Sequence, residues 1–259
     1  MGLCRSRCAQ GGAVVSEGYG RITSIALDPI EKKPISCWRG GTTVLSLGGY
    51  GCNMRCPFCQ NASIAQAGAD DVAWREVAPS DVVETALSLR ERGCIGVAYT
   101  YNEPLITWEF VRDTARLAHE AGLANVLVSN GMATEGVLNE VAPLIDAANI
   151  DLKCANEEGY RSLGGDLRTV KRTIEALVSS PTCHVEVTTL VVPGLSDDEE
   201  QIDDLARWLA ALDPNIPYHL TRFFPQHRMR STGPTPRATL ERLASVARRH
   251  LQTVLLGNV

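Results

Sequence analysis

From Thr42 onward the sequence alternates between short apolar segments and longer amphipathic ones. The short segments have the length and composition of buried strands, and the longer ones show helical spacing. The segment Ser80–Gly93 is typical, because Val83, Ala86 and Leu87 share one helical face and Gly93 is a natural stop. The expected strands are Thr42–Leu47, Ile95–Tyr101, Asn125–Ser129, Asn149–Lys153, His184–Val192, Tyr218–Phe223 and Val254–Leu256. The expected helices are Ser80–Gly93, Thr107–Ala121, Thr134–Ile145, Asp166–Ser179, one that opens at Ser196-Asp197-Asp198-Glu199, and Ala238–Leu251.

Strands that alternate with helices predict an α/β fold with a parallel sheet and right-handed crossovers. Six or seven strand–helix units fall short of the eight of a closed barrel, so we expect a partial (β/α)6–7 TIM-like barrel that is open on one side. At 259 residues and 28.0 kDa the chain suits one large domain. We therefore divide it into an irregular N-terminal extension, residues 1–41, and a core domain, residues 42–259.

Composition and charge exclude several classes of protein. With 44% hydrophobic and 21% charged residues, the chain is an ordinary globular protein and not a disordered one. The net charge of −5 argues against nucleic acid or a membrane surface as the main partner. No apolar run approaches the roughly 20 residues of a membrane span. Nine cysteines, an odd number, with no apolar leader after Met1, indicate a reducing compartment, and we expect a cytoplasmic protein.

Polar residues gather where the expected strands end. In such folds the chemistry lies at the carboxyl ends of the strands, so these residues predict one shared site. They are Cys52, Cys56 and Cys59 after the first strand, Asn102 and Glu103 after the second, Ser129 and Asn130 after the third, Asp151 and Lys153 after the fourth, and His219 in the sixth.

The densest cluster is the group Cys52, Cys56 and Cys59, three thiols within eight positions. Thiolates are soft ligands that favour iron–sulfur clusters, zinc or copper. A closed zinc site or an ordinary [4Fe–4S] cluster needs four protein ligands, and no fourth lies nearby in the sequence. Three thiolates on a four-iron cluster leave one iron open to a small molecule. The alternatives are a zinc site completed by a distant residue such as Cys37 or Cys94, and a redox pair formed by Cys56 and Cys59.

The Cys-x3-Cys-x2-Cys pattern, with the aromatic Phe58 before the last cysteine, resembles the signature of radical S-adenosylmethionine (SAM) enzymes. The wider stretch Gly51–Asn61 is similar to the pyruvate formate-lyase activating enzyme branch of that family. The segments Asp28–Pro34, Cys59–Asn61 and Tyr101–Pro104 resemble the radical SAM member of the AmmeMemoRadiSam group. The resemblance covers nearly the whole chain.

This resemblance implies an oxidoreductase with a [4Fe–4S] cluster on Cys52, Cys56 and Cys59. The family cleaves SAM reductively to a 5′-deoxyadenosyl radical, which abstracts hydrogen from a substrate. An electron donor such as flavodoxin or ferredoxin is implied as a partner. Two substrates remain open: the backbone glycine of a glycyl-radical enzyme, or a small molecule handled with AmmeMemoRadiSam partner proteins. A zinc-binding scaffold without catalysis is the more remote alternative.

The resemblance also assigns roles to single residues, all of them around SAM. A carboxylate suits the SAM ammonium, and an Asp-x-Lys pair suits its carboxylate and a nearby monovalent cation. The implied contacts are Phe58 for the adenine, Asn102 and Glu103 for the amino group, Asp151 and Lys153 for the carboxylate and the cation, Ser129 for the same cation, and His219 for the ribose.

Two further segments carry charge without an assigned role. Gly20–Gly41 includes Asp28, Glu31, Lys32 and Lys33, and it is either a cover for the lateral opening of the barrel or an arm packed on the bottom of the barrel. A basic group near the C-terminus either binds an anionic substrate or partner, or is a solvated surface. Its members are Arg222, His227, Arg228, Arg230 and Arg237.

Overall fold

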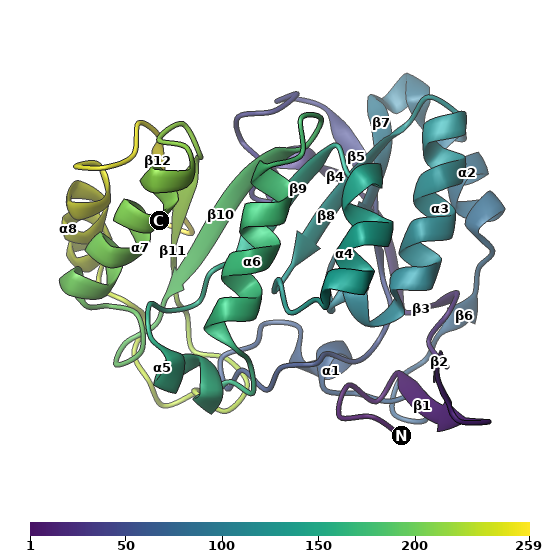
Figure 1. The fold of residues 1–259 in the computed structure, drawn as a ribbon, viewed down its shortest axis with the longest axis horizontal. Helices are drawn as coiled ribbons and strands as arrows, with labels where there is room; N and C mark the ends of the chain where they lie inside the picture. The colour runs from purple at the N-terminus through teal and green to yellow at the C-terminus, as the bar shows by residue number, and fades with distance from the viewer.

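The computed structural model describes all 259 residues, and at its centre lies a curved sheet of eight strands (Figure 1). The strand order is β12-β11-β10-β9-β8-β7-β5-β4, in which all neighbours are parallel except the pair β4 and β5. The sheet does not close on itself, because β12 and β4 form its two edges. The strands are β4 (Ser24–Pro29), β5 (Thr43–Gly48), β7 (Cys94–Tyr99), β8 (Ala124–Ser129), β9 (Ala147–Asp151), β10 (His184–Val191), β11 (Tyr218–Arg222) and β12 (Val254–Gly257).

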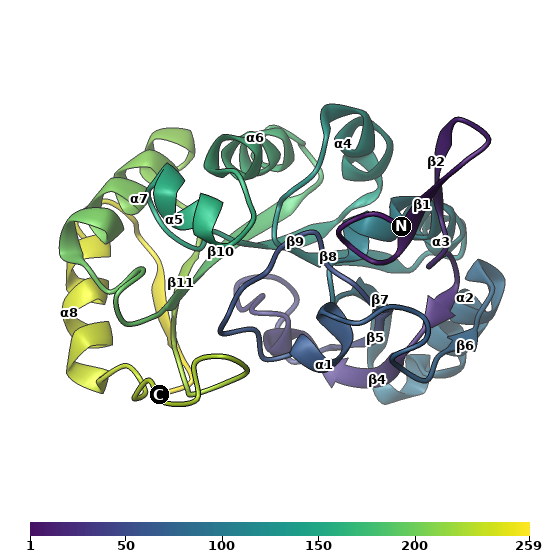
Figure 2. The same ribbon diagram turned by 90° about the horizontal axis from the view of Figure 1, so that it is seen from below.

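Helices cover the convex face of the sheet as an outer layer, and the concave face is turned toward loops (Figure 2). The predicted partial (β/α) barrel is therefore confirmed. No helix is both long and apolar enough to cross a membrane. The α-helices are α1 (Ala62–Ala65), α2 (Pro79–Ser88), α3 (Trp108–Glu120), α4 (Glu135–Val141), α5 (Glu157–Ser162), α6 (Leu167–Val178), α7 (Glu199–Leu212) and α8 (Arg237–Ala247). Short 3₁₀ turns are η1 (Ile30–Lys32), η2 (Arg90–Arg92), η3 (Pro104–Thr107) and η4 (Ala142–Leu144).

The start of α7 differs from the predicted capping box. The helix begins at Glu199, and its N-cap is Asp198, whose side chain accepts a hydrogen bond from the Gln201 amide. The Ser196 hydroxyl instead accepts from the Val192 amide and donates to the Leu190 carbonyl. Ser196 thus closes the turn after β10, and the cap lies two residues further along the chain.

The segment before Thr42 is more regular than predicted. β1 (Arg7–Gln10) and β2 (Ala13–Ser16) form a hairpin, and β3 (Arg21–Ile22) pairs with β6 (Arg75–Glu76). β4 pairs antiparallel with β5 along its whole length, so residues on both sides of the predicted boundary at 41/42 belong to one sheet. The prediction of an irregular extension over residues 1–41 is therefore wrong for these strands. Its missed signal is the period of two in β4, where Ile25 and Leu27 both pack on the main core.

Residues 30–37, which we call the basal segment, cross the concave side of the sheet near the amino ends of the strands. Ile30 and Ile35 are fully buried there against a small core that includes Val44 and Val126. The Asn149 amide donates to the Pro34 carbonyl at 2.7 Å, which attaches the segment to β9. This packing matches the arm on the barrel bottom and not the lateral cover.

Glu186 of β10 attaches the end of the basal segment to the sheet. One carboxylate oxygen accepts from the Ser36 and Cys37 amides, at 2.9 and 2.8 Å, and from the His184 ring at 2.9 Å. The other lies 2.5 Å from Nε2 of His219. Burial alone raises the pKa of this carboxyl, but the hydrogen bonds from both imidazoles and both amides outweigh it and lower the pKa to about 2.

Glu186→Gln is expected to destabilise the protein by about 3 kcal/mol at pH 7, because the neutral amide loses four favourable contacts to the charged form. The folded-state pKa lies below the ordinary value, so this stabilisation is present above about pH 4.5 in the wild type and is lost as the pH falls toward 2. Urea unfolding at several pH values measures it, with the exposed Glu158→Gln as control. Equal midpoints for Glu186→Gln and wild type at pH 7 would contradict this role of Glu186.

Candidate active site

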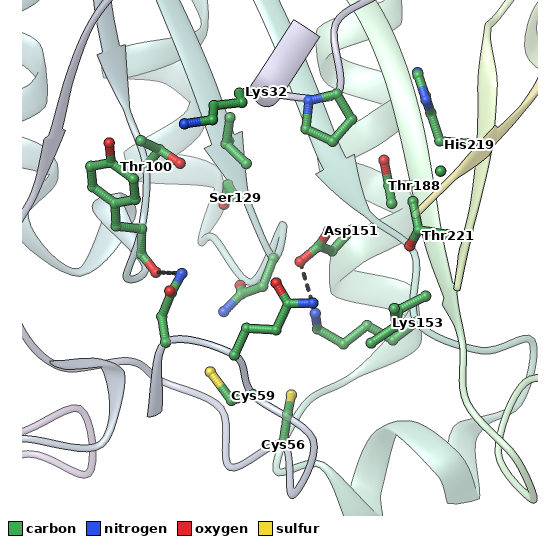
Figure 3. A pocket seen from close by; sticks show the side chains of 18 of the residues that line it. Lys32, Cys56, Cys59, Thr100, Ser129, Asp151, Lys153, Thr188, His219 and Thr221 are labelled. Carbon is green, nitrogen blue, oxygen red and sulfur yellow. Dashed lines mark hydrogen bonds and ion pairs between the residues drawn. The ribbon is translucent and has the colours of Figure 1, made fainter. Parts of the chain in front are cut away.

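A cavity of about 800 Å³ occupies the concave side of the sheet. It extends from the loop after β5, which carries Cys56 and Cys59, to Lys32 of the basal segment (Figure 3). That volume lies toward the upper end of the roughly 300–1,000 Å³ typical of small-molecule sites. All ten residues proposed from the sequence line this cavity: Cys52, Cys56, Phe58, Cys59, Asn102, Glu103, Ser129, Asp151, Lys153 and His219.

The three thiols of the loop face the cavity from its carboxyl-end wall. The Met54 amide donates to the Cys52 sulfur at 3.3 Å, and the Asn130 side chain donates to it at 3.5 Å. Burial raises the pKa of Cys52 to about 12 and also raises the pKa of Cys56 and Cys59. Without a metal these groups are therefore neutral thiols, and a bound metal centre is what makes them thiolates.

The donor set fits an iron–sulfur cluster better than a single ion. No three His, Cys, Asp or Glu side chains stand close enough together to hold one metal ion. In a cluster each thiolate binds a different iron, so the sulfurs are spaced more widely than around one ion. The positive charge of Lys153 favours the ionised form of all three thiols, as does amide donation to Cys52 and Cys59.

The fourth ligands considered for a zinc site lie elsewhere. Cys37 belongs to the basal segment, where its amide binds Glu186, and Cys94 opens β7 opposite Thr43. Both are near the amino ends of the strands, whereas the cysteine loop follows the carboxyl end of β5. A zinc site completed by Cys37 or Cys94 is therefore wrong for this fold.

Asn102 fixes the backbone that leads into the cysteine loop. Its side-chain oxygen accepts from the Gly49 amide at 3.0 Å, and its nitrogen donates to the carbonyls of Tyr50 and Gly51 at 3.2 and 3.1 Å. Gly51 has a φ of +87°, and a Cβ there would overlap the Cys4 carbonyl oxygen, so only glycine fits. The Asn102 side chain, which was expected to contact SAM, therefore uses its polar atoms to position the loop.

Glu103 is buried beneath the cavity wall, with only 2% of its surface exposed. Its carboxylate accepts from the Leu105 amide at 2.9 Å, from the Ser129 hydroxyl at 2.8 Å and from the Asn130 amide at 2.8 Å. Burial raises its pKa to about 7, even though these hydrogen bonds act in the opposite direction. Since a carboxylate has about four acceptor positions, one remains for a further donor.

The hydroxyl of Ser129 is occupied on both sides. It donates to Glu103 and accepts from the Gly131 amide at 3.0 Å. Ser129 therefore orients the Glu103 carboxylate, a role that the sequence did not predict.

Asp151 and Lys153 form an ion pair of 2.9 Å at the end of β9. Figure 3 shows the Lys153 amine between Asp151 and the cysteine loop. Although burial lowers the pKa of Lys153, the negative charge of Asp151 and its hydrogen bond to the amine raise it above its ordinary value. Lys153 therefore remains a cation at this wall of the cavity.

Phe58 and His219 line the cavity from two different elements, the cysteine loop and β11. Phe58 is 5% exposed and stands between two of the cysteines. His219 lies on β11 in register with Thr188 of β10, and its Nε2 is taken by Glu186, so only Nδ1 is left for another partner.

Two cavity residues have no clear sequence signal. Thr188 has a buried hydroxyl without a hydrogen-bond partner. Tyr101 has a φ of +70°, which is rare for an aromatic residue, and its hydroxyl donates to Asp28 at 2.6 Å. Asp28 also binds Lys33 at 2.7 Å, so the Asp28–Pro34 motif attaches the floor of the cavity to the turn after β7 that carries Tyr101. The resemblance of the Asp28–Pro34 motif to a known family was the only sequence signal for these contacts of Asp28.

Comparison with known proteins agrees with this geometry. A family model of the radical SAM superfamily matches residues 47–209. An uncharacterised protein of Methanocaldococcus jannaschii is 35% identical over 268 aligned residues, which cover 100% of this chain and 76% of that protein. The pyruvate formate-lyase 1-activating enzyme of Escherichia coli is 25% identical over 223 residues, 79% of this chain and 88% of the enzyme. The crystal structure of QueE from Escherichia coli shares the fold, with a TM-score of 0.60, 14% identity and coverage of 91% and 92% of the two chains.

The chain belongs to the radical SAM superfamily, because the family model covers more than half of it. Members of this family are enzymes that use a [4Fe–4S] cluster together with SAM.

Proposed function

We propose that this protein uses Cys52, Cys56 and Cys59 to hold a [4Fe–4S] cluster and abstracts hydrogen from a substrate in the cavity. One observation supports this proposal: these three thiols, the Asp151–Lys153 pair and buried Glu103 all line the same cavity. The cluster and SAM together supply reductive cleavage of a C–S bond, which gives methionine and a 5′-deoxyadenosyl radical.

The protein's own residues bind and orient SAM in this proposal. Lys153, a cation beside the cysteine loop, pairs with the SAM carboxylate, and Glu103 offers its remaining acceptor position to the SAM ammonium. The ring of Phe58 packs on the adenine, and Nδ1 of His219 accepts from a ribose hydroxyl. Asp151, about 40% exposed at its side chain, is the carboxylate available to a monovalent cation.

For the substrate, the similarity to the Escherichia coli activating enzyme favours a glycyl-radical enzyme, whose backbone glycine would enter through the open side of the barrel. The Asp28–Pro34 motif, which forms part of the cavity floor, favours the second candidate, a small molecule handled with AmmeMemoRadiSam partners. Incubation of the reduced enzyme and SAM with a glycyl-radical enzyme separates them, because activation leaves a glycyl radical signal on that partner.

Reconstituted protein is expected to hold about four irons per chain and, with dithionite and SAM, to form 5′-deoxyadenosine. Alanine at Cys52, Cys56 or Cys59 should abolish both, since each removes a cluster ligand. Alanine at Cys94 or Cys183, both near the amino ends of the strands, should preserve both and serves as the matched control. Iron analysis and chromatography of the products measure the outcome, and full iron in Cys52→Ala protein would show that the ligands are assigned wrongly.

Glu103→Gln should weaken SAM binding by about tenfold or more, because the ammonium loses a charge-assisted partner worth roughly 1.5–3 kcal/mol. The wild-type affinity should rise between about pH 6 and pH 7.5, since the carboxyl has a pKa of about 7 and must ionise to pair with the ammonium. Equilibrium dialysis across this range, with Glu158→Gln as control, tests both. An affinity within twofold of wild type at every pH would remove Glu103 from the SAM site.

A further inference from the structure

The loop between β11 and α8, residues 223–236, is basic in a protein of net charge −5. No aspartate or glutamate stands between Asp213 and Glu241, whereas the loop carries Arg228 and Arg230. Both arginines are exposed. The charge of this region therefore opposes that of the molecule as a whole.

This loop lies directly against the cysteine loop. The Arg228 amide donates to the carbonyl of Pro57 at 2.9 Å, and Pro57 stands between Cys56 and Phe58. In Figure 1 the loop after β11 runs down to the same end of the sheet as α5. Phe224 is 41% exposed, and the Arg222 guanidinium lies 4.9 Å from the centre of its ring.

The charges of the loop are not neutralised within the chain. Neither the Arg228 nor the Arg230 guanidinium forms an ion pair, whereas Arg237 and Arg242 of α8 pair with Glu241 and Glu199. Neither Arg228 nor Arg230 lines the cavity. Two free cations outside the substrate space, on a loop that also exposes Phe224, are typical of a protein interface and not of a small-molecule subsite.

We infer that residues 222–230 form the docking surface for an acidic one-electron carrier protein. This inference rests on the proposed function, in which the cluster takes one electron from outside for each SAM that is cleaved. The carrier is oxidised by one electron as the cluster is reduced by one. A carrier on this surface sits over the stretch between Cys56 and Cys59, and its negative charge is attracted by the two unpaired arginines.

Charge reversal in the double variant Arg228→Glu/Arg230→Glu tests the docking surface, with reduced flavodoxin as the probe. The matched control is Arg92→Glu/Arg249→Glu, which reverses two exposed, unpaired arginines at the opposite end of the sheet. Affinity for flavodoxin and the rate of cluster reduction are measured between about 0.05 M and about 0.3 M salt, where screening of exposed charges increases. Dithionite-driven formation of 5′-deoxyadenosine is measured in parallel.

At low salt the test variant should bind flavodoxin at least tenfold more weakly, and flavodoxin should reduce its cluster at least tenfold more slowly. Both changes lie within the 10–1,000-fold range of electrostatic steering. Its dithionite-driven activity should match wild type, and the control variant should keep its flavodoxin affinity. Equal weakening in both variants, or unchanged affinity in the test variant, would overturn the inference. So would loss of the dithionite reaction in the test variant alone, because the loop would then serve the cavity. Failure of wild type to cleave SAM with dithionite would refute the proposed function, whereas the binding measurement still decides the docking surface.

Discussion

The cysteine loop can present its three thiols to one cavity only because its backbone is fixed from outside the loop. The Asn102 side chain, at the exit of the next strand, bonds three consecutive residues before Cys52. Arg55 then turns back to donate to the carbonyls of Cys52 and Met54. In each of these contacts a side chain bonds a backbone group and no cysteine sulfur takes part, so the protein itself fixes the backbone of the loop. Preorganisation of this kind reduces the ordering cost of binding.

A single buried carboxylate, that of Glu186, links the two ends of the barrel. Glu186 is completely buried, yet it stays ionised because two imidazoles and two backbone amides surround it. One of those imidazoles, His219, faces the cavity, and both amides belong to the basal segment. The floor of the cavity and a residue of its wall therefore share one carboxylate.

Much of the fold could be predicted from the sequence, because alternating strand and helix patterns are local signals with strong periodicity. The co-location of Cys52, Glu103 and Lys153 followed from the rule that parallel strands end at one edge. β4 could not be predicted as readily, since its pairing with β5 crosses residues 30–42 and rests on only two inward apolar side chains. The hydrogen bonds of Asn102 to the cysteine loop and of Ser129 to Glu103 could not be predicted either, because the type of a residue does not show which distant residue it will bond.

Electron paramagnetic resonance of the reconstituted, reduced protein tests most directly whether three cysteines hold a four-iron cluster with one iron open to SAM. Three thiolates leave one iron without a protein ligand, so added SAM should shift the g values of the reduced cluster in wild type. The Cys94→Ala protein should show the same shift, and Cys56→Ala protein should show no cluster signal. A wild-type spectrum that SAM leaves unchanged would contradict the proposed site.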